Sequence, residues 1–215
     1  IKKCIYPQIL KESIVHPIHK AGSKMQASNY RPVSVQNSLN KVIEREMYDQ
    51  MDEYLGCSGL MDAYQYGFVK GKGCQDIIAK VISMISCSID KKKTIVLISI
   101  DLSKAFDSID HEILLNKMTN MGIGKKAVEL TRSYLSNRHQ FVKVGDSLSH
   151  AGQINKGITQ GSILGPKFFS IYIADIQYLK THSKIFKFAD DIVLLLEIDE
   201  CDKKSSPAEM INEDI

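Results

Sequence analysis

The chain has 215 residues, of which 44% are hydrophobic and 25% are charged, and its formal net charge is +3. This is the composition of a globular protein with one substantial core, or with a core and an attached lobe. It contains no apolar run of membrane-spanning length and no signal-peptide pattern, so we expect no membrane partner.

The cysteines and the charge distribution narrow the class of protein further. Five cysteines, odd in number and never in a C-x-x-C pair, favour reduced thiols in an intracellular protein, nuclear or cytoplasmic, over a disulfide framework or zinc site. Residues 1–35 hold six basic residues against one acidic residue, and residues 66–93 hold six against two. Residues 186–215 hold three basic residues against nine acidic ones. A basic N-terminal part and an acidic C-terminal part suit a protein that holds a polyanion near metal-binding carboxylates. Runs of like charge are also common on solvated faces.

The first predicted elements are a hairpin and two helices. Alternation in SIVHPIHK, followed by NYRPVSV, indicates a hairpin over residues 13–35, with Pro17 favouring an edge strand. Asn37 or Ser38 then caps a helix. Its apolar face is predicted to hold Leu39, Val42, Ile43, Met47, Met51, Tyr54 and Leu55. After the loop GFVKGKG, a second helix carries a stripe that we expect in the core: Ile77, Ile78, Val81, Ile82, Ile85 and Ile89.

The middle of the chain predicts a buried strand and two further helices. TIVLISID, residues 94–101, is a continuous apolar run typical of a central strand buried on both faces, and it ends on Asp101. A helix is predicted over residues 110–121, closed by Gly122, and another over residues 125–135.

The last third predicts two hairpins around a helix. QFVKV and residues 147–155 flank the turn Gly145-Asp146. GITQGS is a loop, and Pro166 fits the first turn of a helix that carries Phe168, Phe169, Ile171, Tyr172 and Ile176. KIFKFA and IVLLLE then form two apolar strands joined by Asp190-Asp191. Helices next to hairpins indicate an α+β fold with a helix-backed antiparallel sheet.

Carboxylates lie at the ends of two of these predicted core strands. If the end of the strand at Asp101 lies beside the Asp190-Asp191 turn, three carboxylates converge, and their repulsion requires compensation. Oxygen ligands without a His or Cys cluster point to Mg²⁺ or Mn²⁺, and two such ions can activate a hydroxyl and stabilise a pyrophosphate leaving group. A pair of aspartates is also common in turns for local hydrogen bonding alone.

Ordered blocks over residues 13 to 197 resemble the fingers and palm of a reverse transcriptase from a non-LTR, LINE-type retrotransposon. NYRPVSVQNSLNKVIE and QYGFVKGKGCQDII resemble the two finger blocks, and SIDLSKAFDSIDHEILLNKM resembles the first aspartate motif. SYLSNRHQFVKVGDSLS and GITQGSILGPKFFSIYIADI resemble the middle blocks, and FKFADDIVLL resembles the double-aspartate motif. The resemblance implies RNA-directed DNA polymerisation with an RNA template, a DNA primer and dNTPs.

The resemblance also implies roles for particular residues. Asp101, Asp190 and Asp191 would hold two Mg²⁺ or Mn²⁺ ions, with Asp191 the less direct ligand, and the backbone carbonyl of Leu102 would add a further ligand. The nucleotide site would comprise the triphosphate-gripping Arg31, a second basic contact at Lys41, the aromatic steric gate Phe106, and the pocket loop at Gln160 and Gly161. Phe106 as a core residue and Lys41 as a solvated helix lysine remain open alternatives.

The same resemblance divides the chain and exposes two departures from the pattern. We predict an N-terminal segment over 1–12, fingers over 13–93, palm over 94–200 and a truncated C-terminal segment over 201–215, with the thumb absent. Val69 stands where the second finger block usually has arginine. An alternative function is therefore a truncated or decayed element product that folds and binds nucleic acid without polymerising.

Overall fold

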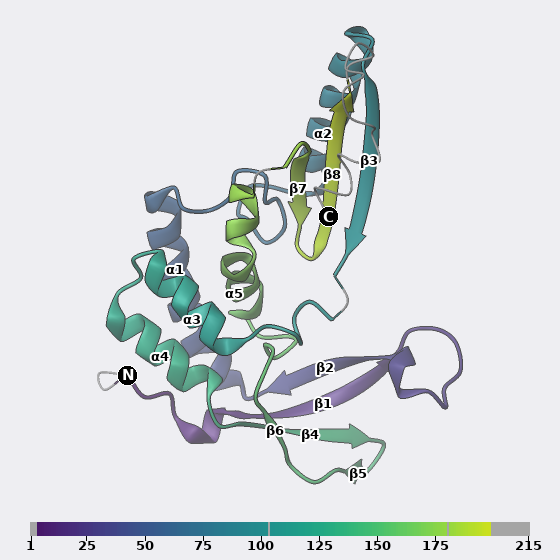
Figure 1. Cartoon of the computed structure of the whole chain (residues 1–215). Helices are drawn as coiled ribbons and strands as arrows, with labels where there is room; N and C mark the ends of the chain where they lie inside the picture. The colour runs from purple at the N-terminus through teal and green to yellow at the C-terminus, as the bar shows by residue number, and fades with distance from the viewer. Residues whose placement is uncertain (1–3, 103, 180, 199–215) are drawn as a thin grey trace. The chain divides into compact units, whose positions relative to one another are not determined.

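A computed structural model describes residues 4–102, 104–179 and 181–198 of the chain (Figure 1). The described residues form two compact units: residues 4–60 with 104–172, and residues 61–102 with 173–179 and 181–198. The predicted segment 201–215 lies outside the described residues. The predicted fingers and palm boundaries are functional divisions, and they stay a prediction. No helix in the described ranges is both long enough and apolar enough to cross a membrane.

The first unit contains a mixed sheet in the order β2-β1-β4-β5, with β6 also paired to β4 (Figure 1). Its strands are β1 (Glu12–His19), β2 (Tyr30–Gln36), β4 (Arg138–Val144), β5 (Ser147–Leu148) and β6 (Gly152–Ile154). The antiparallel pairs β1–β2 and β4–β5 confirm both hairpins predicted in this part of the chain.

The prediction that Pro17 marks an edge strand is wrong for β1 as a whole. β4 pairs in parallel with the first half of β1, from Glu12 to Val15. The half that contains Pro17 is paired with β2 alone within the described residues. A proline lacks an N–H donor, so it is tolerated where the second edge of the strand has no ladder partner.

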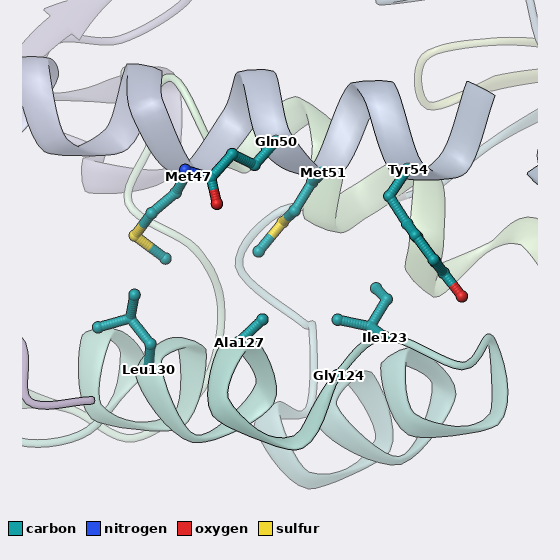
Figure 2. Close-up of a pocket in the computed structure, with 8 residues that line it drawn as sticks. All are labelled: Met47, Gln50, Met51, Tyr54, Ile123, Gly124, Ala127 and Leu130. Carbon is teal, nitrogen blue, oxygen red and sulfur yellow. The ribbon is translucent and has the colours of Figure 1, made fainter. Parts of the chain in front are cut away.

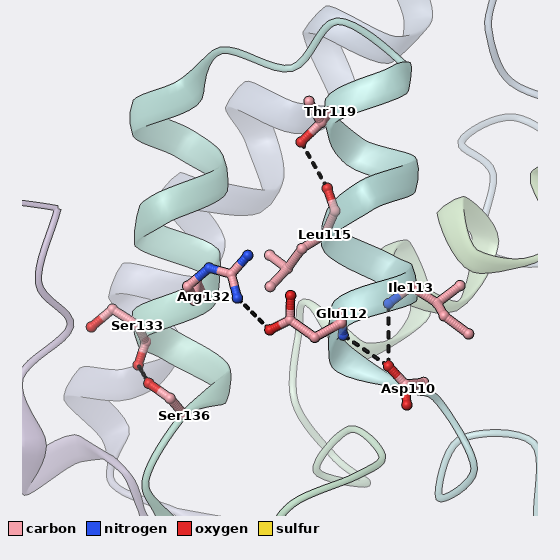
Figure 3. Close-up of polar contacts among 8 residues, drawn as sticks. All are labelled: Asp110, Glu112, Ile113, Leu115, Thr119, Arg132, Ser133 and Ser136. Atoms are coloured by element: carbon pink, nitrogen blue, oxygen red, sulfur yellow. Dashed lines mark hydrogen bonds and ion pairs between the residues drawn. The ribbon is translucent and has the colours of Figure 1, made fainter.

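Four helices accompany this sheet, and their ends follow local capping rules. They are α1 (Ser38–Ser58), α3 (His111–Asn120), α4 (Lys125–Leu135) and α5 (Gly165–Tyr172). The Asn37 side chain accepts the Leu39 N–H at the start of α1, and the Asp110 carboxylate accepts the N–H groups of Glu112 and Ile113 (Figure 3). Short 3₁₀ helices lie at Gln8–Leu10, Ala27–Asn29 and, in the second unit, Ala174–Tyr178. The predicted helix with Phe168 therefore ends before Ile176.

The α3 and α4 helices lie side by side and share a polar link. The Arg132 guanidinium of α4 donates to the Glu112 carboxylate of α3 (Figure 3). Below this surface pair the core is apolar, with Leu114, Met118 and Phe168 fully buried. The surface pair contributes little, because exposed ion pairs are worth roughly 0–1 kcal/mol, so burial holds these helices together.

The buried face of α1 differs from the predicted one. Leu39 and Val42 are 65% and 67% exposed, whereas Asn40 and Glu44 are completely buried. The buried stripe on α1 consists of Asn40, Glu44, Met47, Met51 and Leu55. Hydropathy alone predicts the wrong buried face for α1. The polar residues Asn40 and Glu44 are buried instead, because they have buried hydrogen-bond partners elsewhere in the unit.

An apolar pocket of about 220 Å³ separates parts of α1 and α4 (Figure 2). Met47 and Met51 point into it from α1, and Ala127 and Leu130 face them from α4 (Figure 2). Flexible methionine side chains tolerate irregular packing of this kind.

The second unit is an antiparallel sheet in the order β3-β8-β7 with one helix against it (Figure 1). Its elements are α2 (Cys74–Asp90), β3 (Thr94–Asp101), β7 (Lys184–Phe188) and β8 (Asp191–Ile198). The mixed helices and sheets of both units confirm the predicted α+β fold class.

Two predictions for this unit are wrong in detail. Among the described residues β3 is an edge strand, with Leu97 49% exposed, and β8 is the central strand. The α2 helix packs against the sheet. Ile77 and Val81 are half-buried and Ser88 is buried, whereas Ile78 and Ile82 are 56% exposed. Only part of the predicted stripe is therefore on the less exposed face of α2, because the most apolar face and the buried face do not coincide.

Candidate functional site

The end of β3 and the start of β8 bring two of the predicted aspartates together. Asp101 is the antiparallel partner of Asp191 in the strand register. Directly opposite residues share a face of the sheet, with Cβ atoms about 4.5–5.5 Å apart. Both residues are exposed. The pairing extends along the full length of both strands, from Thr94–Ile198 to Asp101–Asp191, so the approach of these carboxylates follows from the sheet itself.

The turn between β7 and β8 differs by one residue from the predicted one. Phe188 pairs with Asp191, so the two turn residues are Ala189 and Asp190, and Asp191 is already in the strand. Ala189 has a φ of 56°, in the left-handed region that a residue with a Cβ seldom adopts. Asp190 therefore lies at the tip of the hairpin, directly before the residue opposite Asp101.

The donor chemistry at this rim suits a hard divalent cation. Two facing carboxylates repel each other, and in the described part of the chain neither Asp101 nor Asp191 has an ion pair with a basic side chain. Carboxylate oxygens are the ligands that Mg²⁺ and Mn²⁺ prefer. No group of three or more His, Cys, Asp and Glu side chains in the described ranges is arranged to hold a metal ion. The convergence of all three aspartates therefore stays a prediction.

In the first unit, the loop with Gln160 and Gly161 is tied to two other segments. The Ser34 N–H of β2 donates to the Gln160 carbonyl at 3.1 Å, and the Gln160 side-chain amide donates to the Asp107 carboxylate at 3.2 Å. Gly161 has a φ of 102°, and a Cβ there would lie 2.9 Å from the Ser34 carbonyl oxygen. Only glycine fits this close backbone approach.

Phe106 lies in the same unit, and its ring is half-buried. It stacks on Phe169 of α5, with ring centroids 4.9 Å apart and an interplanar angle of 30°. The Phe106 carbonyl accepts the Ile158 N–H at 2.9 Å, so this segment is joined to the loop that leads to Gln160. The stacking anchors one face of the ring, and both the steric-gate and the core interpretation stay open.

The two basic residues predicted to contact nucleotide are both exposed. Arg31 lies on β2 opposite Ile18, and Lys41 lies in the first turn of α1. Within the described residues neither side chain takes part in an ion pair. Both are therefore accessible to an anionic ligand, and their roles stay predictions.

Sequence reasoning missed a buried polar network around Glu44 of α1. One carboxylate oxygen accepts from the Tyr134 hydroxyl at 2.6 Å and from the Asn40 amide at 2.9 Å. The other accepts the Ile163 N–H at 2.7 Å, in the loop that follows Gly161. The only sequence signal was a polar pair, Asn40 and Glu44, on the same helical stripe as Met47.

The network also raises the pKa of the Tyr134 hydroxyl. Burial, and then the charge of Glu44, raise the pKa of Tyr134 well above its ordinary value of 10. The buried Arg138 guanidinium lies 4.7 Å from the centre of the Tyr134 ring and opposes this shift. The hydroxyl of Tyr134 therefore stays protonated and serves as a donor to Glu44.

Comparison with known proteins supports the resemblance noted in the sequence. Residues 18–211 match the family described as reverse transcriptase (RNA-dependent DNA polymerase). The chain is 27% identical over 206 residues to a probable RNA-directed DNA polymerase from transposon BS of Drosophila melanogaster, covering 92% of this chain and 23% of that protein. It is 26% identical over 191 residues to the RNA-directed DNA polymerase from mobile element jockey of the same species, covering 88% and 20%. The chain thus spans about a fifth of the length of these relatives.

Solved structures show the same fold. Apo telomerase from Candida tropicalis, truncated from its C-terminal domain, aligns with a TM-score of 0.65 at 13% identity, covering 97% of this chain and 46% of that chain. Telomerase from the same species in complex with a fragment of telomeric RNA aligns with a TM-score of 0.63 at 12% identity, covering 97% and 40%. The fold and the family match agree, and the resemblance to non-LTR retrotransposon polymerases is confirmed. The chain belongs to the reverse transcriptase family.

Proposed function

We propose that the chain provides the polymerase centre for RNA-directed DNA synthesis inside the cell. A primer 3′-hydroxyl attacks the α-phosphate of a bound dNTP, and pyrophosphate leaves. The observation that carries this proposal is the register of β3 and β8, which sets Asp101 opposite Asp191, with Asp190 next in the turn. The reverse transcriptase family match supports the choice of this reaction.

The three carboxylates at this rim would hold the metal. We assign Asp101 and Asp190 as principal ligands, with Asp191 and the Leu102 carbonyl as further ligands, for two Mg²⁺ or Mn²⁺ ions. When bound, such ions supply charge for activating a hydroxyl and for stabilising a pyrophosphate leaving group. Without a cation, the facing pair Asp101 and Asp191 would repel each other and the phosphates alike.

Residues of the other unit would bind the nucleotide and the template. Arg31 offers a forked, permanently charged donor for a triphosphate, and Lys41 adds a second positive charge. Phe106 would leave no room for a 2′-hydroxyl, and Gly161 allows the close backbone approach that its contact with Ser34 already requires. The partners are an RNA template, a DNA primer and a dNTP. We assign residues 13–93 to fingers and 94–200 to palm.

Replacing one metal ligand tests this proposal. In the full reading frame that contains this chain, Asp101→Asn should lower Mg²⁺-dependent dNTP incorporation on an RNA template and DNA primer by about 100-fold or more. Asp146→Asn, at an exposed position in the β4–β5 turn, is the matched control and should incorporate normally. Circular dichroism should show that both variants fold.

The outcomes separate the two candidate functions. Undiminished incorporation by Asp101→Asn would refute the assignment of Asp101. If the full reading frame itself binds primer and template but does not extend the primer, the alternative of a decayed product that binds nucleic acid without polymerising is correct.

A further inference from the structure

The strand that leads into the Asp190 turn is hydrogen-bonded on both edges. On one edge β7 pairs with β8. On the other edge the Tyr66 N–H donates to the Lys187 carbonyl at 2.8 Å, and the Lys187 N–H donates to the Tyr64 carbonyl at 3.0 Å. Gln65 and Lys187 form an isolated parallel bridge between these bonds. Residues 62–67, which we name the clamp segment, therefore act as a short extra strand that ends beside the turn.

A buried ion pair ties the start of the clamp segment to the same strand. The Lys187 ammonium lies 2.6 Å from the Asp62 carboxylate, and the two side chains are 1% and 4% exposed. Lys187 also donates to the Ile173 carbonyl at 3.2 Å, and Asp62 accepts the Tyr64 N–H at 2.8 Å. A buried charge is costly unless it is paired, so each partner of this ion pair requires the other.

The end of the clamp segment lies directly against the backbone of the turn. A Cβ on Gly67 would lie 2.1 Å from the Ala189 nitrogen, 2.8 Å from the Ala189 Cα and 2.9 Å from the Phe188 carbonyl carbon. No side chain fits there, and the obstructing atoms are main chain, so they cannot rotate away. The contact is made at the residue that holds the left-handed conformation and precedes Asp190.

The outer side of the clamp segment is held as well. The Lys72 ammonium donates to the carbonyls of Ala63 at 2.6 Å and Gln65 at 3.2 Å, and it lies 4.8 Å from the centre of the Tyr66 ring. The Gln65 side chain accepts the Gly67 N–H at 3.0 Å. A strained conformation such as that of Ala189 persists only where its surroundings hold it, and these contacts supply that constraint.

We propose that the clamp segment sets the position of the Asp190 carboxylate, with Gly67 and the Asp62–Lys187 pair as positioning residues; this inference rests on the proposed role of Asp190 as a metal ligand. The block QYGFVKGKG, which resembles a finger block, thereby acts on the metal-binding turn through its first residues. The positioning contacts that we propose come from residues 62–67 and Lys187. They therefore do not require the arginine that the finger block usually has where this chain has Val69.

The inference is tested by adding a methyl group at position 67 and, as a matched control, at another glycine of the same loop. In the full reading frame, Gly67→Ala should displace the turn, whereas Gly73→Ala should not, because a Cβ on Gly73 meets only the Asp76 carboxylate at 3.7 Å. Three measurements are made: amide hydrogen exchange over residues 184–192, Mn²⁺ affinity by electron paramagnetic resonance, and steady-state kinetics of dNTP incorporation, which give kcat and KM. Asp190→Asn is the benchmark.

We expect the amide hydrogens of residues 184–192 to exchange faster in Gly67→Ala than in the wild type. This variant should also bind Mn²⁺ about tenfold more weakly, and its kcat should fall on the order of 100-fold with little change in KM. Asp62→Asn is the second variant: it keeps the shape and the acceptor for the Tyr64 N–H but leaves the buried Lys187 unpaired, and it should change the same quantities in the same direction. Gly73→Ala should match the wild type in all three.

Wild-type exchange and Mn²⁺ affinity in both Gly67→Ala and Asp62→Asn would overturn the inference. Normal incorporation by Asp190→Asn would instead refute the proposed role of Asp190, and the exchange measurement would still decide whether the clamp segment holds the turn.

Discussion

Replacing Glu44 by glutamine should destabilise the first unit although the two side chains have nearly the same shape. Glu44 is completely buried, and its two oxygens accept three donors from Asn40, Tyr134 and the Ile163 backbone. Glutamine retains one carbonyl oxygen and places an NH₂ group where the second oxygen was. If the oxygen faces Tyr134 and Asn40, the NH₂ meets the Ile163 N–H; in the opposite orientation it meets the Asn40 amide.

The magnitude follows from the number of donors left without an acceptor. In either orientation of the new amide at least one donor loses its acceptor, the part-buried Ile163 N–H or the buried Asn40 amide, which costs about 1–3 kcal/mol. For a chain of this size each kcal/mol lowers Tm by roughly 2–4 °C, so we expect a decrease of about 2–12 °C. Glu44→Ala should cost more, because all three donors lose their acceptors and a cavity remains.

Urea unfolding followed by circular dichroism measures this loss of stability. Glu46→Gln is the matched control on the same helix. The Glu46 side chain is exposed and, within the described ranges, accepts only from the Gln50 amide, so the effect should stay within about 0.5 kcal/mol. If Glu44→Gln were as stable as this control, water would reach the carboxylate and the buried network would not contribute as we describe.

Three further predictions concern ligand choice, binding and pH. Phe106→Val should admit ribonucleotides, so that kcat/KM for a dNTP divided by kcat/KM for the matching rNTP falls by about 10- to 1000-fold. Phe106→Tyr should change this ratio little. An unchanged ratio in Phe106→Val would make Phe106 a core residue. Binding of this chain to an RNA–DNA duplex, measured by fluorescence anisotropy, should weaken steeply with salt, on the order of 10³-fold between about 50 and 200 mM, if the basic segments 1–35 and 66–93 contact phosphates as we propose. A flat salt profile would contradict this. Because the pKa of Tyr134 is raised in the folded state, its contribution to stability is present below the unfolded pKa of about 10 and is lost as pH rises above that value. Tyr134→Phe should therefore lose less stability at alkaline pH in urea titrations. An equally steep loss in this variant would assign the pH dependence to other groups.

Local sequence determined most of the elements in both units. The hairpin over β1 and β2, the capped helices α1 and α3, and the turn at Gly145-Asp146 all form as predicted. These features depend on hydropathy period and on side chains that bond neighbouring backbone groups, which are interactions within a few residues. The motif order likewise pointed to the reverse transcriptase family before any fold was known, and the family match confirmed it.

Tertiary structure decided which strand is central and which polar residues are buried. TIVLISID has the composition of an inner strand, yet β3 lies at the edge among the described residues, because pairing order depends on where β8 docks. Glu44 and Lys187 are of residue types that usually lie at the surface. Each is nevertheless buried against a partner far along the chain, Ile163 for Glu44 and Asp62 for Lys187. A charged side chain can be buried only where distant segments supply its hydrogen bonds, and no local pattern records which segments will meet.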